Sequence, residues 1–290
     1  MRRRAVLLCV CAAAVLACAL LALRPRPSAR SLGLFCWDDA TLEAERSTLE
    51  ACVRQAGVTE VYQAFPESWL SSGRAGLFVR QMRRSGVTVY ALAGAAQWAR
   101  DPEGAELIRE LEAVAAYNAG QKEANRITGV MADVEPYLLE EWDAGGAERD
   151  ALMDAYLSGM RAAYACAVRN GLELWVCVPT FFDVTHPDQL EALVSGACDG
   201  VAVMNYNRTD EYGQMAAEVE LARRHGREVV CIYELQEAGL HGLEEINTYA
   251  GLGLEALRQS EAALEQAFGY GGLGFAYHYY KPLKAMLGLD

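Results

Sequence analysis

Residues 127–135 read Ile-Thr-Gly-Val-Met-Ala-Asp-Val-Glu, a short apolar run that ends in two acids. Stretches with helical spacing lie on either side of it, at 103–125 and 148–170. A short β-rich run between two amphipathic helices indicates a strand in an alternating β/α chain. The fold prediction starts from this run, because the same unit repeats along the chain.

Eight such runs alternate with helical stretches, and several helices end at a glycine just before the next strand. The expected strands are 32–37, 58–65, 87–94, 127–135, 172–179, 200–207, 228–235 and 272–279. Eight units between residues 31 and 290 match the size of an α/β (β/α)₈ TIM barrel. We therefore expect one barrel domain over 31–290, with a doubly wound open sheet as the alternative. No Gly-x-Gly-x-x-Gly or Walker motif supports a nucleotide-binding fold.

The composition supports a folded protein that binds neutral or cationic ligands. The chain is 52% hydrophobic and 22% charged, which excludes disorder as its main state. Residues 1–30 contain six Arg and no acid, so residues 31–290 carry 20 basic groups against 39 acidic ones. Such a body repels phosphate backbones, which argues against nucleic acid as a partner.

The first 30 residues form an export or anchoring segment with a linker. Three Arg precede the 19 uncharged residues 5–23, which is just long enough to cross a bilayer once. An uncleaved single-pass anchor with the body outside the cell membrane is favoured, and a cleaved secretory signal or a lipoprotein are the alternatives. Residues 24–30 are expected to be a short linker.

Cysteine and histidine spacing gives no sign of a metal or another cofactor. None of the nine Cys forms a Cys-x-x-Cys pair, and we expect buried free thiols, with a disulfide left open. The four His lie far apart and lack metal-ligand spacing. They are His186, His225, His241 and His278.

The two acids that end the run at 127–135 are the strongest chemical signal. Alternation along a strand places Asp133 and Glu135 on one face, which points into a barrel at its catalytic end. Two carboxyls crowded there shift each other's pKa, so that one can remain protonated and act as a general acid. Glycosidic cleavage needs such an acid. The alternative is that both acids only cap helices or pair with Arg126 or Arg208.

Two motifs resemble those of family 18 glycosidases, which are chitinases and endo-β-N-acetylglucosaminidases on a (β/α)₈ barrel. Residues 128–135, Thr-Gly-Val-Met-Ala-Asp-Val-Glu, resemble the strand-4 signature Asp-Gly-x-Asp-x-Asp-x-Glu. Residues 204–207, Met-Asn-Tyr-Asn, resemble the strand-6 motif Met-x-Tyr-Asp/Asn. The chain departs from the family at Thr128 and Met131, which replace two acids, and it lacks the strand-8 Trp.

The resemblance implies hydrolysis of β-linked N-acetylhexosamine glycans. Glu135 would be the general acid/base, and Asp133 would orient the 2-acetamido group, whose carbonyl acts as internal nucleophile. Tyr206 would hydrogen-bond that group. Polar groups and aromatic rings at the strand ends suit sugars, and the expected substrate contacts are Trp37, Asn205, Asn207, Tyr233 and Tyr277.

Two other functions remain open. Glu234 shares the inward face of its strand and could be the nucleophile of a retaining clan A glycosidase, with Glu135 as acid/base. A carbohydrate-binding barrel without catalysis would fit the departures at Thr128 and Met131, and a purely structural role is weaker. The sequence predicts no oligomeric state.

Overall fold

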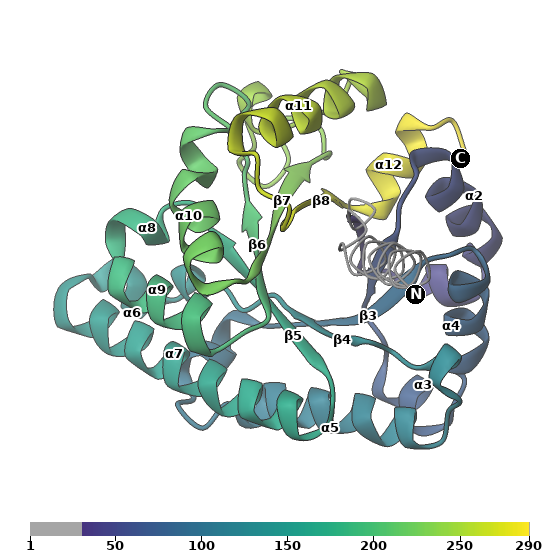
Figure 1. Ribbon diagram of the computed structural model, residues 1–290, viewed down its shortest axis with the longest axis horizontal. Helices are drawn as coiled ribbons and strands as arrows, with labels where there is room; N and C mark the ends of the chain where they lie inside the picture. Colours follow the sequence, from purple (N-terminus) through teal and green to yellow (C-terminus); the bar gives the residue numbers. More distant parts are fainter. Residues whose placement is uncertain (1–30, 290) are drawn as a thin grey trace, which may run out of the picture. The chain divides into compact units, whose positions relative to one another are not determined.

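The structure, a computed structural model, describes residues 31–289, in which eight parallel strands close into a barrel in chain order (Figure 1). The strands are β1 Leu32–Cys36, β2 Glu60–Gln63, β3 Thr88–Ala93, β4 Gly129–Ala132, β5 Glu173–Pro179, β6 Gly200–Met204, β7 Glu228–Glu234 and β8 Leu273–His278. β8 pairs with β1, with Leu32 opposite Phe275, which closes the ring. The prediction of a (β/α)₈ barrel is confirmed.

Helices surround the strands (Figure 1). The longer ones are α2 Arg46–Ala56, α4 Ala75–Arg84, α5 Ala105–Ala119, α7 Gly146–Arg169, α9 Pro187–Gly196, α10 Ala216–His225 and α11 Gly253–Phe268. The shorter ones are α3 Glu67–Ser71, α6 Glu140–Ala144, α8 Phe182–Thr185 and α12 Tyr280–Met286. Gly57 and Gly226 end α2 and α10 in the left-handed conformation, as the sequence pattern predicts.

Alternation along the strands separates two apolar layers. Inside the barrel, Met131 packs with ten other buried residues that include Ile232 and Ala276. The neighbours of those residues, Tyr233 and Tyr277, point outward and join the larger core between the strands and the helices. The apolar interior supports the strand ends, where the polar groups gather.

The six cysteines of the described residues are buried and free, which confirms the expected thiols. They are Cys36, Cys52, Cys166, Cys177, Cys198 and Cys231. The predicted anchor or signal at residues 1–30 lies outside the described residues. Within residues 31–289, no helix is long and apolar enough to cross a membrane.

Candidate active site

A cavity of about 360 Å³ opens at the C-terminal ends of the strands, and we call it the acid pocket. Asp133 and Glu135 line it just beyond β4, and Tyr206 lines it just beyond β6. His278 at the end of β8 and Trp37 after β1 complete the polar and aromatic wall. The apolar remainder of the lining includes Phe35, Met204 and Ile232.

Close packing of two chain segments fixes the position of Asp133. The Asp133 N–H donates to the Ala93 carbonyl at 2.9 Å, which extends the β3–β4 pairing past the end of β4. A Cβ atom at Gly94 would lie 1.9 Å from the Asp133 carbonyl oxygen. Only glycine fits there, so the main chain itself holds Asp133 at the edge of the pocket.

The Asp133 carboxyl is the least satisfied acid of the pocket. Burial, followed by the charge of Glu135, raises the pKa of Asp133 to about 6, while His278 and the Cys177 thiol act in the opposite direction. Its Oδ1 atom is buried and has no hydrogen-bond partner. A buried acceptor without a donor costs free energy, so Asp133 is ready to accept a hydrogen bond from a ligand.

Tyr137 holds the side chain of Glu135. It lies two residues after Glu135, and its hydroxyl donates a hydrogen bond to Glu135 Oε1. Burial, followed by the charge of Glu135, raises the pKa of Tyr137, so the phenol stays protonated and remains a donor. The hydroxyl also lies 3.7 Å from Met204 Sδ, on the floor of the pocket.

Tyr206 supplies a second phenol to the pocket. A side chain from another loop fixes its main chain, because Asn247 Nδ2 donates a hydrogen bond to the Tyr206 carbonyl at 2.6 Å. Burial, followed by the charges of Glu234 and Asp133, raises the pKa of Tyr206 well above its ordinary value. The hydroxyl is therefore a protonated donor at every physiological pH.

Buried Glu234 pairs with His278, a partly exposed residue of the pocket lining. Glu234 Oε2 lies 2.9 Å from His278 Nδ1, and only 3% of the Glu234 side chain is exposed. Glu234 Oε1 accepts the backbone N–H groups of Leu235 at 2.9 Å and Gln236 at 2.8 Å. Both carboxylate oxygens are thus occupied, and Glu234 is not part of the pocket lining.

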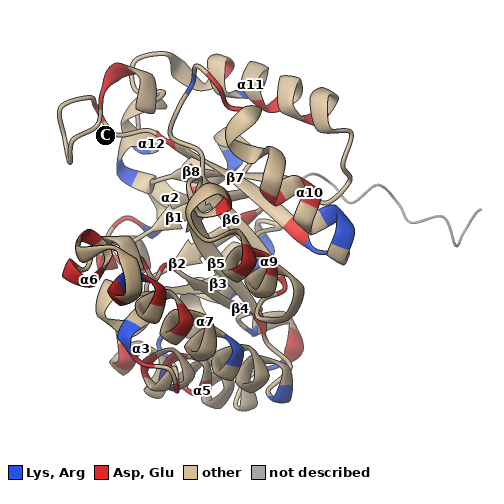
Figure 2. Ribbon diagram, turned by 90° about the vertical axis from the view of Figure 1, so that its left-hand side faces the viewer, with Lys and Arg blue, Asp and Glu red and all other residues tan. Residues whose placement is uncertain are grey.

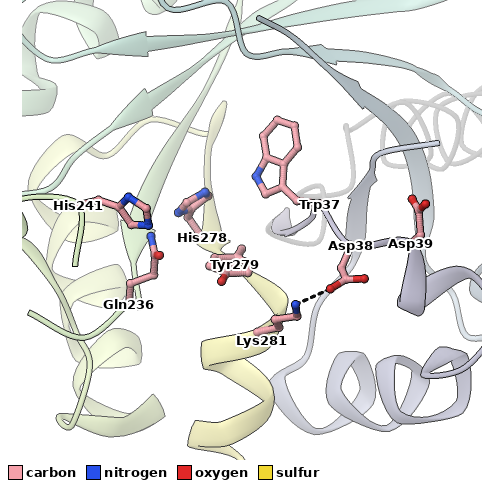
Figure 3. A pocket seen from close by; sticks show the side chains of 8 residues that line it. All are labelled: Trp37, Asp38, Asp39, Gln236, His241, His278, Tyr279 and Lys281. Atoms are coloured by element: carbon pink, nitrogen blue, oxygen red, sulfur yellow. Dashed lines mark ion pairs between the residues drawn. The ribbon is translucent and has the colours of Figure 1, made fainter. Parts of the chain in front are cut away.

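A larger cavity of about 770 Å³ adjoins the acid pocket, and we call it the outer cavity (Figure 3). Trp37 and His278 line both cavities. Figure 3 shows Gln236 and His241 on one side of it and Asp38 and Asp39 on the other. Lys281 pairs with Asp38, and its hydrogen bond lowers the pKa of that acid.

A cluster of aromatic side chains, Tyr137, Phe181 and Trp142, lies next to Glu135. The rings of Tyr137 and Phe181 lie 5.4 Å apart edge to face, and Trp142 lies 5.7 Å from Phe181. Phe181 is 38% exposed, so its ring is accessible to a ligand that leaves the acid pocket on this side. Exposed aromatic faces suit the C–H faces of sugars.

Acidic residues outnumber basic ones over residues 31–290. Figure 2 shows Asp and Glu spread over the helices, including α6, α7 and α11, with fewer Lys and Arg. Among residues 31–289, no group of three His, Cys, Asp or Glu side chains is arranged to hold a metal ion.

Of the nine predicted site residues, the structure brings Asp133, Glu135, Tyr206 and Trp37 to the acid pocket, with Glu234 just behind it. The other four do not line either cavity. Tyr233 and Tyr277 are fully buried and face α11, where their hydroxyls meet Ser260 Oγ at 2.8 Å and Glu261 Oε1 at 2.7 Å. Their placement in the site is corrected, because their strand positions point outward.

Two asparagines near Tyr206 support the loop instead of the pocket. Asn205 is 3% exposed, and its Nδ2 donates to the Glu211 carbonyl at 2.9 Å. Asn207 Oδ1 accepts the Thr209 N–H at 3.0 Å. Amide side chains that bond the nearby backbone stabilise turns, which accounts for Asn205 Nδ2 and Asn207 Oδ1. Asn205 Oδ1 is buried and has no hydrogen-bond partner.

Sequence reasoning missed the role of His278, which it considered only as a metal ligand. Alternation marks Glu234 as inward on β7, but only the register of β7 against β8 places His278 opposite it. The contact of Tyr137 with Glu135 was not predicted either. Its spacing of two residues from Glu135 was the signal there.

Comparison with solved structures finds the same fold in several enzymes at low identity. A GH18 chitinase from Pseudoalteromonas aurantia has a TM-score of 0.55 and 10% identity, over 90% of this chain and all 100% of that one. A GH18 chitinase from Cycas revoluta in complex with allosamidin has a TM-score of 0.53 and 15% identity, over 89% and 97% of the two chains.

A D-psicose 3-epimerase from Clostridium cellulolyticum H10 has a TM-score of 0.50 and 10% identity, over 86% and 85% of the two chains. No family model matches the chain, and no curated protein matches it by sequence. The likeness therefore shows a shared barrel, which different chemistries use.

Proposed function

We propose that the protein hydrolyses glycosidic bonds of β-linked N-acetylhexosamine glycans with the help of the substrate's own acetamido group. The observation that carries the proposal is that Asp133, Glu135 and Tyr206 line one cavity at the catalytic end of the barrel. The barrel shared with GH18 chitinases and the two sequence motifs support the same chemistry.

Each of the three residues has a distinct task. Glu135, protonated, gives its proton to the glycosidic oxygen as the bond to the anomeric carbon breaks. The acetamido carbonyl attacks that carbon, and the positive charge that develops is balanced by the Asp133 carboxylate, which accepts the acetamido N–H. Tyr206 donates a hydrogen bond to the same group. Glu135 then takes a proton from the water that opens the intermediate.

The two residues that depart from the family 18 pattern, Thr128 and Met131, lie outside the acid pocket lining. Thr128 lies at the start of β4, and its hydroxyl accepts a hydrogen bond from Arg83 at 2.7 Å. Met131 is fully buried in the apolar interior below Asp133. Neither side chain is part of the acid pocket lining, which does include Asp133 and Glu135.

Glu234 is not proposed as the nucleophile. Its two oxygens accept three hydrogen bonds from His278, Leu235 and Gln236, and they would have to give these up to reach an anomeric carbon. The competing function is a sugar-binding barrel without turnover. Export to the cell surface or secretion stays a prediction of the N-terminal sequence.

The first test is turnover on a defined panel of glycans. The full-length chain, purified in mild detergent, is incubated with chitin oligomers, peptidoglycan fragments, N-glycans and acetamido-free β-glucans, and products are identified by mass spectrometry. We expect cleavage of the acetamido sugars alone. Cleavage of β-glucans would overturn the substrate-assisted mechanism, and binding without any product would favour the sugar-binding barrel.

Matched variants tie turnover to the pocket. Glu135→Gln keeps the size of the side chain and removes the acid, which we expect to lower kcat about 10²–10⁴-fold. Glu140→Gln makes the same change at a side chain that is 90% exposed, and it serves as the control. Equal rates for both variants would contradict the assignment of Glu135.

A further inference from the structure

Exposed apolar side chains gather on the two segments that follow β4 and β5. Leu138 is 63% exposed and Val184 is 79% exposed, and the exposed ring of Phe181 belongs to the same segments. Together with the partly exposed rings of Tyr137 and Trp142, we call them the apolar rim. Single exposed hydrophobic residues are ordinary, but a group of them beside a cavity indicates a binding surface.

Ring contacts make the apolar rim continuous with the acid pocket. Tyr137 lines the pocket and donates a hydrogen bond to Glu135. Its ring lies 5.4 Å from that of Phe181 and 6.4 Å from that of Trp142. Val184 lies three residues after Phe181, in α8. A ligand that extends past Glu135 on this side therefore reaches an apolar surface.

The chemistry of the apolar rim suits a hydrocarbon better than a further sugar. An aromatic ring can take either one, but the aliphatic side chains of Leu138 and Val184 offer no hydrogen bond to a hydroxyl group. Two polar groups beside the rim are already bonded within the protein. Thr185 Oγ1 donates to the Phe181 carbonyl at 2.8 Å, and Arg149 Nε donates to the Trp142 carbonyl at 2.8 Å.

The other side of the acid pocket is polar. Trp37 and His278, which line both cavities, lie at the ends of β1 and β8, whereas Tyr137 and Phe181 follow β4 and β5. In a closed ring of eight strands in chain order, β1 and β8 lie across from β4 and β5. The acid pocket thus separates the apolar rim from the outer cavity, whose lining includes three charged side chains, Asp38, Asp39 and Lys281.

The position of Glu135 decides which part of a substrate meets the apolar rim. In the proposed reaction Glu135 gives its proton to the oxygen of the leaving group, so that group departs beside Glu135 and Tyr137. We propose that the leaving group is an aliphatic alcohol, and that the substrate class is a glycoside with an acetamido-sugar head and a hydrocarbon chain. The sugars lie in the acid pocket and toward the outer cavity, and the chain lies on the apolar rim.

The cleavage step of this inference rests on the proposed function. Water adds across the bond between the anomeric carbon and the leaving oxygen, and the products are the free sugar and the alcohol. No other reactant is needed. The binding of the hydrocarbon chain does not depend on cleavage, so the two are tested separately.

The length of the alkyl chain is the first variable to test. The substrates are methyl, butyl and hexyl β-glycosides of di-N-acetylchitobiose, and the full-length chain is kept at one fixed concentration of mild detergent. Full burial of one methylene strengthens binding about fourfold, and an open rim should give about half of that free energy. We therefore expect kcat/KM to rise about 30-fold from methyl to hexyl. Equal values for the three substrates would overturn the inference.

Matched variants assign the chain-length effect to the apolar rim. The double change Leu138→Ser and Val184→Ser should lower the hexyl-to-methyl ratio of kcat/KM to about fivefold or less, and Val184→Ser alone carries the test if the double variant fails to fold. Leu77→Ser with Val168→Ser is the control, because these side chains are 59% and 60% exposed on α4 and α7. An equal loss in the control would contradict the assignment.

Binding to Glu135→Gln separates the inference from the proposed function. Calorimetry should show tighter binding of the hexyl than of the methyl glycoside, with a more negative heat-capacity change. That result without cleavage by the wild type would support the apolar rim and sink the proposed function. Cleavage of chitin oligomers without any chain-length effect would do the reverse. Equal binding of 1-hexanol and the hexyl glycoside would indicate a general apolar surface and overturn the inference.

Discussion

Both ends of the barrel hold buried acids and tyrosines, yet only one end is arranged for chemistry. At the N-terminal end, Tyr62 donates to Glu60 Oε2 at 2.9 Å, and Tyr90 and Trp175 donate to Glu173 Oε2 at 2.8 and 3.1 Å. At the C-terminal end, Asp133 lines a cavity, and its buried Oδ1 atom has no hydrogen-bond partner. A buried acid is thus no sign of a site unless it has unused hydrogen-bonding capacity and room for a ligand.

The neighbouring titratable side chains are the second difference. His278 acts on Asp133 at the C-terminal end, whereas Glu60 feels the charges of Glu228 and Glu173. Burial, followed by those charges, raises the pKa of Glu60 to about 7, despite the hydrogen bond from Tyr62. The N-terminal acids therefore affect stability, and the C-terminal acids are expected to affect turnover.

Two glycines give the largest expected contrast between the ends. A Cβ at Gly94 would lie 1.9 Å from the Asp133 carbonyl oxygen, and one at Gly129 would lie 2.1 Å from that of Glu173. Gly94→Ala and Gly129→Ala should each lower the free energy of unfolding by about 1–3 kcal/mol, measured with urea. Only Gly94→Ala should also reduce turnover, by about 100-fold or more, because it displaces Asp133. Similar losses of turnover in the two variants would contradict the expected difference between the two ends of the barrel.

Two tyrosines test the same contrast through single hydroxyl groups. Tyr137→Phe removes the donor to Glu135, and we expect kcat/KM to fall about 3–10-fold, because a typical hydrogen bond contributes about 0.5–1.5 kcal/mol. Tyr90→Phe removes a donor to Glu173 and should lower stability with unchanged kinetics. Kinetic assays and urea unfolding of both variants test this. A kinetic defect in Tyr90→Phe would contradict the view that the N-terminal end affects only stability.

Stability at the N-terminal end should depend on pH. The pKa of Glu60 is raised in the folded state, so its favourable contribution is present below its ordinary value of 4.5 and is lost as the pH rises through about 7. Glu60→Gln should therefore stabilise the protein by about 1–3 kcal/mol at pH 8 and little at pH 4. Urea unfolding at the two pH values tests this, and a pH-independent difference would refute it.

The smallest expected effect concerns the wall shared by the two cavities. Trp37 is 36% exposed and lines both the acid pocket and the outer cavity. Trp37→Ala should raise KM about 3–10-fold with kcat nearly unchanged, since an aromatic face contributes about 0.5–1.5 kcal/mol beyond its area. Trp175→Phe at the other end should leave KM unchanged. A fall in kcat for Trp37→Ala would point to a part in the chemistry itself.

The barrel and its acids were predictable because both depend on local patterns. The periods of strands and helices are visible in any short stretch, and alternation places Asp133 and Glu135 on the same side. Alternation also explains the error at Tyr233 and Tyr277. Each stands one position from an inward residue, Glu234 or His278, so each must point away from the pocket.

What sequence could not supply was contact between distant residues. The Glu234–His278 bond depends on the register of β7 against β8, which no local pattern reveals. The missing hydrogen-bond partner of Asp133 Oδ1 is a second example, because it depends on the positions of neighbours that are distant in the sequence. Asn205 and Asn207 were expected to contact the ligand. Instead, Asn205 Nδ2 and Asn207 Oδ1 make hydrogen bonds to the backbone of their own loop.

The closure of β8 against β1 has a consequence for the time course of synthesis. Because a chain is made from its N-terminus, Trp37 and Asp133 are in place long before His278 is added. Until β8 arrives, the edges of β1 and β7 are unpaired and the acid pocket lacks one wall. The growing protein therefore passes through a stage that needs protection from aggregation, and His278 arrives with the strand that ends that stage.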